Sequence, residues 1–265
     1  MITASIVVYN SPVKQLQTAV DCILRSQIAK LWIVYNGPDE KINDYKSIAG
    51  TEFIRVANNG FGAGHNVAIS KALEIGSDYH LVMNADIRWK GDAITPLAKK
   101  MDDDNDIALI APEVTYPDGR LQYTCRMLPR PINLFARRFL SERVAERLDY
   151  RYLLKDIDHR LPINAPYFIG CFMLLRLSAI REAGAFDERY FMYPEDIDLT
   201  RRLHRKWKTL YYPAVSIVHE HQQESRKNYR MLKIHISNMI KYFNKWGWFF
   251  DKERRDFNRR LRQKS

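Results

Sequence analysis

The stretch FDERYFMYPEDIDL, residues 186–199, sets the interpretation of this chain. Three carboxylates, Glu195, Asp196 and Asp198, directly follow an aromatic cluster and Pro194, and an apolar helical pattern comes next. Proline suits the first helical position, and acids in a first turn complement the helix dipole, so this stretch predicts the start of a helix. Carboxylates beside apolar rings can also acquire the raised pKa that suits a general base. The stretch alone leaves both interpretations open.

The composition is that of a globular protein, with 46% hydrophobic and 28% charged residues in a chain of 265. This length accommodates one large α/β domain or two small ones. The formal net charge is +11, and much of the excess of lysine and arginine lies in the segment 229–265. A basic charge placed in this way predicts attraction to an anionic surface, either a membrane or a nucleic acid.

Cysteine usage and the N-terminal sequence bear on the location of the protein. The three cysteines, Cys22, Cys125 and Cys171, are widely spaced and lack metal-ligand spacing, which favours a reducing compartment. The chain begins with a strand-like run, without a basic signal sequence, and no run reaches the about 18 apolar residues that a spanning helix needs. We therefore expect a cytoplasmic protein that can lie on a membrane without crossing it.

Strands and helices alternate over residues 1–115. Continuous apolar runs predict buried strands, and the segments between them carry apolar residues at helical spacing. The expected strands are 2–8, 31–35, 51–56, 79–83 and 107–114, and the expected helices begin after residue 12, at the glycine-rich loop and at residue 93. Strands joined by helices in this order are typical of right-handed βαβ units. Residues 1–115 are therefore expected to form a nucleotide-binding half.

The glycine-rich loop NNGFGAGHN, residues 58–66, opens one of these helices. Glycines at a helix N-terminus leave backbone N–H groups free to meet phosphate oxygens, but they also permit a sharp turn. The loop does not match the dinucleotide-binding fingerprint, because its glycine spacing differs and it follows the third strand instead of the first. Phosphate binding and a simple turn both remain open.

The fourth strand runs directly into Asn84-Ala85-Asp86. A carboxylate at the carboxyl end of a buried parallel strand lies where open α/β sheets bind ligands, and it suits a divalent cation that bridges a diphosphate. His219 and His221 are two residues apart on a predicted strand, so their side chains point the same way. They would join Asp86 as metal ligands only if the fold brings them together. A turn aspartate and a core or surface histidine pair are the alternatives.

The second half of the chain has a looser pattern. We expect a turn at 117–119 and a basic helical insert at 137–151. An apolar run covers 167–175, and after it we expect a short helix with Ser178 as its N-cap and Gly184 at its end, and separate strands over 209–212 and 215–218. The segment 229–265 interleaves aromatic and aliphatic residues with lysine and arginine, as interfacial helices on anionic lipid do. Docking of this segment on the domain is the competing interpretation.

Taken jointly, the motifs resemble the family 2 glycosyltransferases of the GT-A fold, particularly the bacterial rhamnosyltransferase-like branch. The matching pieces are SIVVYN at 5–10, NG at 36–37, NGFGAGHN at 59–66, MNAD at 83–86, GCFML at 170–174, the stretch 186–199 and HEH at 219–221. The resemblance implies an α/β fold with a Rossmann-like mixed sheet flanked by helices. It also implies a donor-binding half at 1–115, an acceptor-binding and catalytic half at 116–228, and a basic aromatic C-terminal helical segment at 229–265.

The resemblance also implies roles for individual residues. The nucleotide-sugar donor would contact Val8, Tyr9, Asn10, Asn36, Asn59, Gly60, Gly64, Asn66, Asn84 and Asp86. Asp86 would ligate Mg²⁺ or Mn²⁺, with His219 as a candidate second contact. The catalytic base would be Asp196, with Glu195 next, and the acceptor side would include Tyr193, Asp198 and His221, with Asp198 a positioning or structural acid.

Two departures from the family pattern bear on these roles. The first acid of the family's Asp-x-Asp motif is Asn84 here, and Tyr35 stands where the family often has an aspartate that contacts the base. The identity of the nucleotide base therefore stays open, with dTDP-sugars and UDP-sugars as the candidate donors.

The function implied is metal-dependent, inverting transfer of a sugar, best guess L-rhamnose from dTDP-rhamnose, to a lipid-linked intermediate of a surface polysaccharide such as O-antigen or capsule. The enzyme would work at the inner face of the bacterial cytoplasmic membrane. The alternatives are a UDP-hexose-dependent transferase and a catalytically idle basic module for membrane or nucleic acid. No nucleic-acid motif supports the latter, and a glycosidase has no need of the glycine-rich loop. The oligomeric state stays open.

Overall fold

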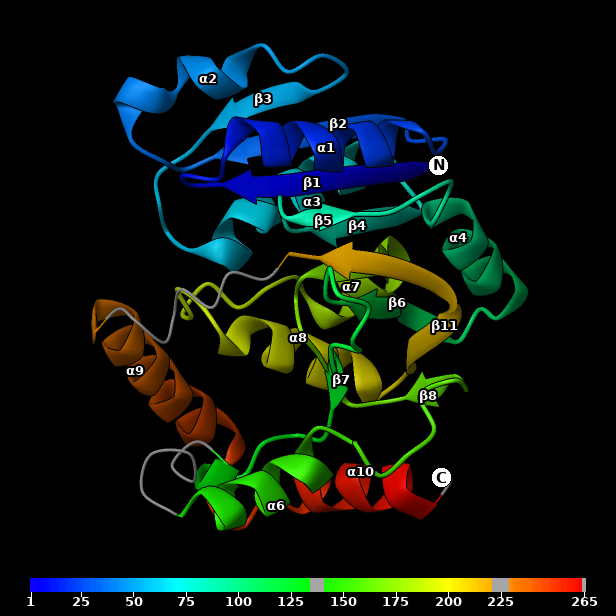
Figure 1. The fold of residues 1–265 in the computed structure, drawn as a ribbon, viewed down its shortest axis with the longest axis vertical. Coiled ribbons are helices and arrows are strands. Elements are labelled where there is room, and N and C mark those ends of the chain that lie inside the picture. Colours follow the sequence, from blue (N-terminus) through cyan, green and yellow to red (C-terminus); the bar gives the residue numbers. More distant parts are fainter. Residues whose placement is uncertain (134–140, 221–228, 264–265) are drawn as a thin grey trace.

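The computed structural model describes residues 1–133, 141–220 and 229–263, apart from the side chains of residues 142 and 230. A mixed sheet forms its centre (Figure 1). The strands are β1 (Ile2–Val8), β2 (Lys30–Tyr35), β3 (Glu52–Arg55), β4 (Tyr79–Met83), β5 (Ile87–Arg88), β6 (Ile107–Thr115), β8 (Ile163–Asn164), β10 (Phe172–Arg176) and β11 (Lys208–His219), in the order β3-β2-β1-β4-β10-β6-β11-β5, with β8 on β11. A separate ribbon pairs β7 (Cys125–Arg126) with β9 (Tyr167–Phe168).

Strand direction decides where the strand ends gather. β1, β2, β3 and β4 are parallel, β10 runs antiparallel between β4 and β6, and β11 is parallel to β6. The arrowheads of β1 and β11 accordingly point to the same side in Figure 1. The carboxyl ends of β1, β2, β4 and β11 therefore lie along one edge, where open α/β sheets bind ligands.

Helices cover both faces of the sheet. The helices in the described part of the chain are α1 (Val13–Leu24), η1 (Asp39–Lys41), α2 (Asn43–Lys46), α3 (Phe61–Glu74), α4 (Ile94–Asp103), α6 (Glu142–Tyr152), α7 (Leu177–Ala183), α8 (Pro194–His204), α9 (Tyr229–Trp246) and α10 (Lys252–Gln263). The core cluster on one face includes α1 and α4, and the cluster on the other includes α3, α7 and α8. In β2, Ile33 packs into the first cluster and Trp32 and Val34 into the second, which explains the continuous apolar runs of the strands.

The predicted strands over 1–115 and the GT-A-like mixed sheet are confirmed, but two predictions for the second half are wrong. The segments 209–212 and 215–218 belong to the single strand β11, whose pairing with β6 shifts register between Tyr212 and Ser216. Pro213 cannot donate to the ladder, so the strand bulges there and then resumes its pairing. Ser178 lies inside α7 and is not its cap, because α7 follows β10 directly and has Arg176 at the N-cap position.

The C-terminal helices pack on the domain through an apolar cluster of their own. Met239, Tyr242 and Phe243 of α9 are buried against Tyr190 and Ile197, the latter in α8. Among the described residues, no helix combines the length and the apolar content needed to cross a bilayer.

Candidate functional site

The carboxyl ends of β1 and β2 bring four of the predicted donor contacts together. The Asn36 N–H donates to the Val8 carbonyl at 2.9 Å, and Tyr9, which follows Val8, is 56% exposed. Asn10 accepts a hydrogen bond from Lys41. A Cβ on Gly37 would lie only 1.9 Å from the Tyr9 carbonyl oxygen, so this glycine lets the two strand ends close on each other.

Asn36 is the buried polar group at this end of the site. Its side chain is 5% exposed, and its Nδ2 donates to Asn58 Oδ1 at 3.3 Å. Its Oδ1 has no hydrogen-bond partner among the described residues. A buried acceptor without a partner is costly, so this oxygen is suited to receive a donor from a bound ligand such as a nucleobase.

The glycines of the loop at 58–66 hold backbone segments in close contact. Gly60 has a φ of +107°, and a Cβ there would lie 2.0 Å from the Phe191 carbonyl oxygen. That oxygen accepts the Phe61 N–H at 3.1 Å. A Cβ on Gly64 would lie 2.8 Å from Val7, so Gly64 lets α3 approach β1. These contacts favour the interpretation that both glycines serve close packing. Of the loop residues predicted to contact the donor, Asn59 is exposed.

Asn66 connects α3 to the acidic stretch. Its Nδ2 donates to the Phe186 carbonyl and to Glu188 Oε1, and its Oδ1 accepts the Phe186 N–H at 3.0 Å. The amide is thereby engaged on both sides. This arrangement favours a positioning role for Asn66 over the direct donor contact expected from the family pattern.

Gly60→Ala is expected to lower the free energy of unfolding by about 1–3 kcal/mol, because alanine at a positive φ would also press against the Phe191 backbone. Urea denaturation measures the change. Gly119→Ala is the matched control, since Gly119 has a φ of +83° and an added methyl group there would have nothing within 4 Å. Equal losses in the two variants would mean that the contact with Phe191 does not matter.

Asp86 and His219, 133 positions apart in the sequence, meet at the edge of the sheet. Their Oδ1 and Nε2 atoms lie 3.3 Å apart, and the Glu220 N–H donates to the Asp86 carbonyl. Burial lowers the pKa of His219, but Asp86 and Cys171 more than offset this and raise that pKa to about 10. The predicted association of Asp86 with His219 is present in the fold, whereas His221 lies outside the described residues.

Gln122 fixes the orientation of the His219 ring. The Gln122 Nε2 donates to the His219 carbonyl at 2.8 Å, which leaves its Oε1 facing His219 Nδ1 at 2.9 Å. Because an amide oxygen only accepts, Nδ1 carries a proton. With a pKa of about 10 the ring also carries a proton on Nε2 at neutral pH, and a cation bound beside Asp86 would displace that proton and use the Nε2 lone pair. This is the arrangement in which a histidine ligates a metal through Nε2.

The donor set fits a divalent cation that shares its coordination with a substrate. A carboxylate oxygen of Asp86 and an imidazole nitrogen of His219 face each other at the carboxyl edge of the sheet. The described residues contain no group of three histidine, cysteine or acidic side chains able to hold a metal alone. Mg²⁺ and Mn²⁺ sites with one or two protein ligands are completed by phosphate oxygens and water.

The predicted catalytic acids, Glu195 and Asp196, are buried in the first turn of α8. They are 3% and 7% exposed. The Asp196 carboxylate accepts the Gly170 N–H at 3.0 Å and the Ile197 N–H at 2.7 Å. Glu195 Oε2 has no hydrogen-bond partner among the described residues. The two acids thus share one buried site but differ in how well a negative charge is supported.

Burial raises the pKa of both acids. Desolvation and the neighbouring Asp196 raise the pKa of Glu195 well above its usual range. Desolvation also raises the pKa of Asp196, to about 7, against the opposing effects of the Gly170 and Ile197 N–H groups and Arg126. The pair therefore carries no more than one negative charge near neutral pH, and the hydrogen bonds favour placing that charge on Asp196.

Two consecutive residues connect the acid pair to the candidate metal ligands. Gly170 donates to Asp196, and the next carbonyl, that of Cys171, accepts the Asn84 N–H at 2.9 Å. Asn84 begins the segment that ends at Asp86. Asp196 and the segment that carries the candidate metal ligand Asp86 are therefore hydrogen-bonded to consecutive residues of the short segment that leads into β10.

The other predicted acceptor-side residues are tied to the C-terminal helix. Asp198 is fully buried, and its carboxylate accepts Arg202 Nε, Lys245 Nζ and Trp246 Nε1 at 2.6–2.8 Å. This favours the structural interpretation of Asp198. Tyr193 has a φ of +93° and its ring lies 4.6 Å from that of His235 in α9, at the turn that begins α8.

Three elements of the site carry no signal that the sequence alone reveals. Gln122 and Arg126 come from the loosely patterned region 116–166, where the sequence shows no chemistry beyond charge. The Gly170 amide acts through the backbone, which every residue except proline possesses. The GCFML match at 170–174 is the one signal that points to this segment.

Known proteins resemble this chain in sequence. A family model described as "Glycosyl transferase family 2" matches residues 3–184. An N-acetylglucosaminyl-diphospho-decaprenol L-rhamnosyltransferase of Mycobacterium tuberculosis is 29% identical over 175 residues, which are 62% of this chain and 56% of the relative, so the match spans little more than half of that protein. The rhamnosyltransferase WbbL of Escherichia coli K12 is 26% identical over 73% of this chain and 74% of its own length.

Solved structures share the fold at low sequence identity. GalNAc-T7, solved with UDP, GalNAc and Mn²⁺, superimposes with a TM-score of 0.63 at 15% identity over 84% of this chain and 44% of the other. The mannosyltransferase PcManGT from Pyrobaculum calidifontis, solved with GDP-Man and Mn²⁺, gives 0.57 at 13% identity over 91% and 64%. The expected GT-A fold is confirmed. The family model matches more than half of this chain, so the chain belongs to glycosyl transferase family 2.

Proposed function

We propose that this protein transfers a sugar from a nucleotide donor to a hydroxyl group of a lipid-linked glycan, with L-rhamnose from dTDP-rhamnose as the first candidate. The observation that carries the proposal is the connection of Asp196 to the Asn84–Asp86 segment through Gly170 and Cys171. This connection would bring the proposed base next to the candidate diphosphate site. The names of both relatives support rhamnose, and the name of the mycobacterial relative also supports a lipid diphosphate acceptor.

The donor would lie along the carboxyl edge of the sheet. Its nucleoside would reach the ends of β1 and β2, where Asn36 offers a buried acceptor, and its diphosphate would lie near Asp86 and His219. A divalent cation held by these two residues would offset the negative charge that develops on the departing diphosphate. Two solved neighbours of the same fold contain Mn²⁺ with a nucleotide or nucleotide sugar, which supports a metal of this kind.

Asp196 would deprotonate the acceptor hydroxyl. Its pKa of about 7 lets it be ionised and still accept a proton near neutral pH, and Glu195 would remain protonated beside it. Gly170 holds one oxygen of the Asp196 carboxylate by its N–H. Attack of the activated hydroxyl on the anomeric carbon in a single displacement would invert that centre.

The basic C-terminal segment is consistent with a lipid-linked acceptor. An acceptor with a polyprenyl chain lies in a membrane, so the enzyme would act at the cytoplasmic face of the bacterial inner membrane. The same site with a UDP-hexose donor remains the second candidate, because Tyr35 replaces the acid that would select the base.

Calorimetric titration with dTDP, UDP and GDP, each with and without Mn²⁺, tests the donor site. We expect one nucleotide to bind in the presence of Mn²⁺, and Asp86→Ala to weaken that binding by at least about tenfold, because the variant removes one of the two facing donors. Asp103→Ala removes an exposed acid on α4 and serves as the control. Absence of binding by all three nucleotides would overturn the proposal.

A further inference from the structure

The corner between α9 and α10 exposes two consecutive phenylalanines. Phe249 is 73% exposed and Phe250 is 93% exposed. Large apolar side chains are seldom left so exposed side by side unless the surface meets a partner or a membrane. The exposed pair therefore indicates a binding partner or surface that can accommodate aromatic rings.

The corner is held rigidly by buried hydrogen bonds. Arg254 is 4% exposed, and its guanidinium donates to the carbonyls of Gly247 and Trp248, directly before the phenylalanines. Asp251, directly after them, is buried and bonded to Arg201. The two rings are thus presented to solvent by a fixed backbone, so their exposure is a property of the fold.

A basic face of α10 begins next to the two rings. Lys252, Arg255, Arg259 and Arg262 recur at spacings of three and four residues, so they share one side of the helix, and all four are exposed. The opposite side is buried through Arg254, Asn258 and Leu261. Helix α10 therefore turns a predominantly basic face outward.

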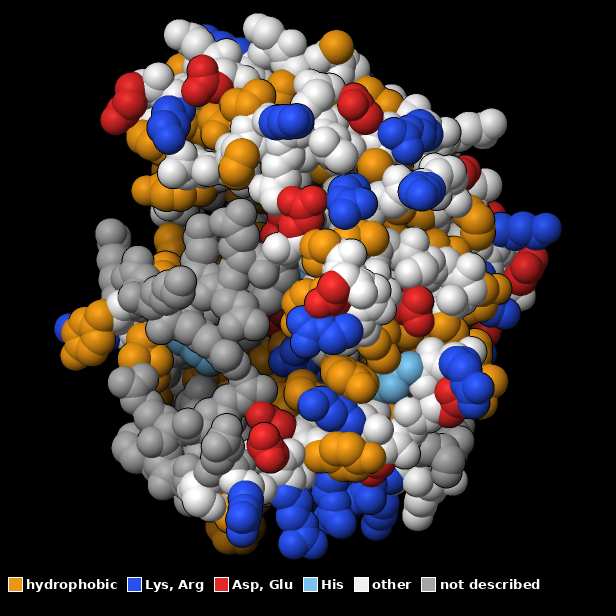
Figure 2. All heavy atoms as spheres, in the orientation of Figure 1, with side chains coloured by type: hydrophobic (Ala, Val, Ile, Leu, Met, Phe, Trp, Pro, Cys, Tyr) orange, Lys and Arg blue, Asp and Glu red, His pale blue; other side chains and the backbone are white. Residues whose placement is uncertain are grey.

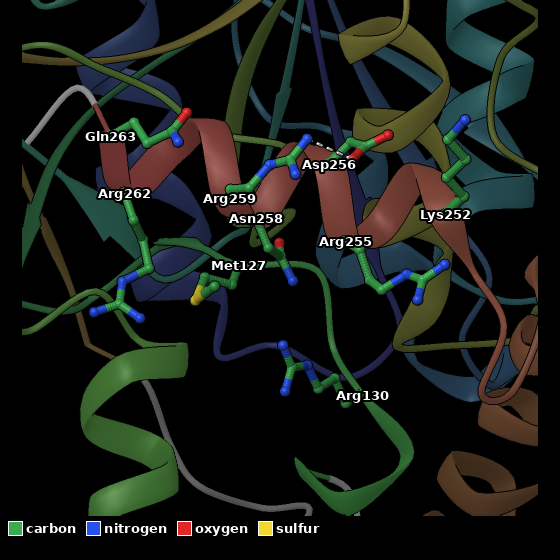
Figure 3. A pocket seen from close by; sticks show the side chains of 9 residues that line it. All are labelled: Met127, Arg130, Lys252, Arg255, Asp256, Asn258, Arg259, Arg262 and Gln263. Carbon is green, nitrogen blue, oxygen red and sulfur yellow. Dashed lines mark hydrogen bonds and ion pairs between the residues drawn. The ribbon is translucent and has the colours of Figure 1, made fainter.

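This face borders a groove of about 760 Å³. Figure 3 shows Arg255 extending from α10 on the side of the loop that carries Arg130, and Arg262 extending toward helix α6. Asp256 also lines the groove, but it is paired with Arg259 at 2.9 Å. Within the described part of the chain, Arg130, Lys252 and Arg255 have no acidic group at ion-pair distance. The groove thus offers unneutralised cations to an anionic ligand.

The basic surface continues onto α6. A second groove of about 530 Å³ is shared between Arg262 and the α6 residues Arg143, Arg147 and Arg151. Two acids, Glu146 and Asp156, also line it, and Asp156 lies 3.6 Å from Arg262, so the arginines outnumber the acids without being wholly unpaired. Figure 2 shows lysine and arginine side chains gathered at the lower end of the molecule, where Figure 1 places α6 and α10. The surface is broad enough to meet many phosphate groups at once.

We propose that this corner docks the protein on an anionic phospholipid bilayer, with Phe249 and Phe250 entering the interface and the α10 face binding headgroup phosphates. Exposed aromatic rings beside clustered basic residues are the combination that interfacial segments use on anionic lipid. A nucleic-acid duplex would use the positive charge, but its stacked base pairs offer no apolar layer for two adjacent rings; single strands, whose bases can stack on aromatic rings, are covered by the nucleic-acid outcome of the test. The docking goes beyond the transfer reaction and holds for any donor or acceptor.

Sedimentation of the full chain with vesicles tests the docking. Binding is expected to phosphatidylglycerol-containing vesicles and not to pure phosphatidylcholine vesicles at the same ionic strength. Lys252→Glu/Arg255→Glu is expected to weaken it by about tenfold or more, since each basic residue near the surface contributes about fivefold. Lys14→Glu/Lys99→Glu changes the net charge equally on the exposed surfaces of α1 and α4 and should leave binding nearly intact.

The phenylalanines have a separate test with its own control. Phe249→Ser/Phe250→Ser is expected to weaken vesicle binding by about tenfold or more, whereas Ile75→Ser/Leu161→Ser, which removes two other exposed apolar side chains, should not. Equal losses from test and control pairs would overturn the proposal. So would binding to pure phosphatidylcholine, or binding to nucleic acid or inorganic polyphosphate without binding to vesicles. Nucleotide titration of the same variants should be unchanged, which keeps this test distinct from that of the transfer reaction.

Discussion

Asp196→Asn is expected to lower kcat by about 10²–10⁴-fold, the usual contribution of a general base, with little change in nucleotide affinity. The amide keeps the shape of the side chain but cannot accept a proton from the acceptor hydroxyl. Its oxygen can still accept the Gly170 N–H, so the segment that leads to Cys171 and Asn84 stays in place. Transfer assays and calorimetry on the same preparation separate these two effects.

The pH dependence of the wild-type enzyme follows from the same carboxyl group. Burial raises the pKa of Asp196 to about 7, so a catalytic base at Asp196 would be protonated and idle below that pH. We expect kcat to rise with pH through about 7 and then level off. Stability should move the opposite way, because a raised folded-state pKa means that the stabilisation present at low pH is lost as pH rises through about 7. The slope should be smaller in Asp196→Asn.

Asp187→Asn is the matched control within the same stretch. Arg189 and Lys245 hold the pKa of Asp187 below its usual range, so it stays ionised across the tested pH values. Its replacement should leave the pH profile of kcat unchanged. If Asp196→Asn turned over normally while Glu195→Gln did not, the base would be Glu195 and the assignment of charge within the pair would be reversed.

The sequence predicted the strands of the first half because each is an apolar run buried on both faces. It could not predict that β10 runs antiparallel between β4 and β6, since pairing between strands distant in sequence leaves no local pattern. The bulge in β11 was missed because Pro213 resembles a strand end when the pairing partner is unknown.

Some features of the candidate site could likewise be predicted from the sequence, and others could not. Asp86 could be identified by its place at the end of a strand, and its meeting with His219 depends on β11 lying at the same edge. The roles of Gly64 and Asn66 could not be separated from donor binding, because a glycine that admits a helix and one that admits a phosphate have the same sequence signal. Gln122 could not be predicted, because it contributes to the site only by orienting the His219 ring.

Arg201→Met is expected to lower the free energy of unfolding by about 3–5 kcal/mol, the usual cost of removing one partner of a buried ion pair. Arg201 is 1% exposed and donates to both carboxylate oxygens of Asp251 at 2.7 Å. Asp251 is 4% exposed, so its charge would be left in the interior, where among the described residues only the longer ion pair with Arg254 Nε, at 3.8 Å, would remain to offset it. Urea denaturation measures the loss. Lys30→Met, which breaks an exposed pair with Glu52, should cost less than about 1 kcal/mol.

A second variant separates the buried charge from the lost packing of the arginine. Arg201→Met/Asp251→Asn removes both charges, and the side-chain oxygen of the introduced asparagine can still accept the Arg254 N–H that Asp251 accepts now. The double variant should therefore be more stable than Arg201→Met alone. If both were equally unstable, the loss would come from the contact of Arg201 with Trp246, whose ring centre lies 4.1 Å from the guanidinium carbon. Because Asp251 directly follows Phe250, the single variant should also expose the α9–α10 corner to proteases before the sheet unfolds.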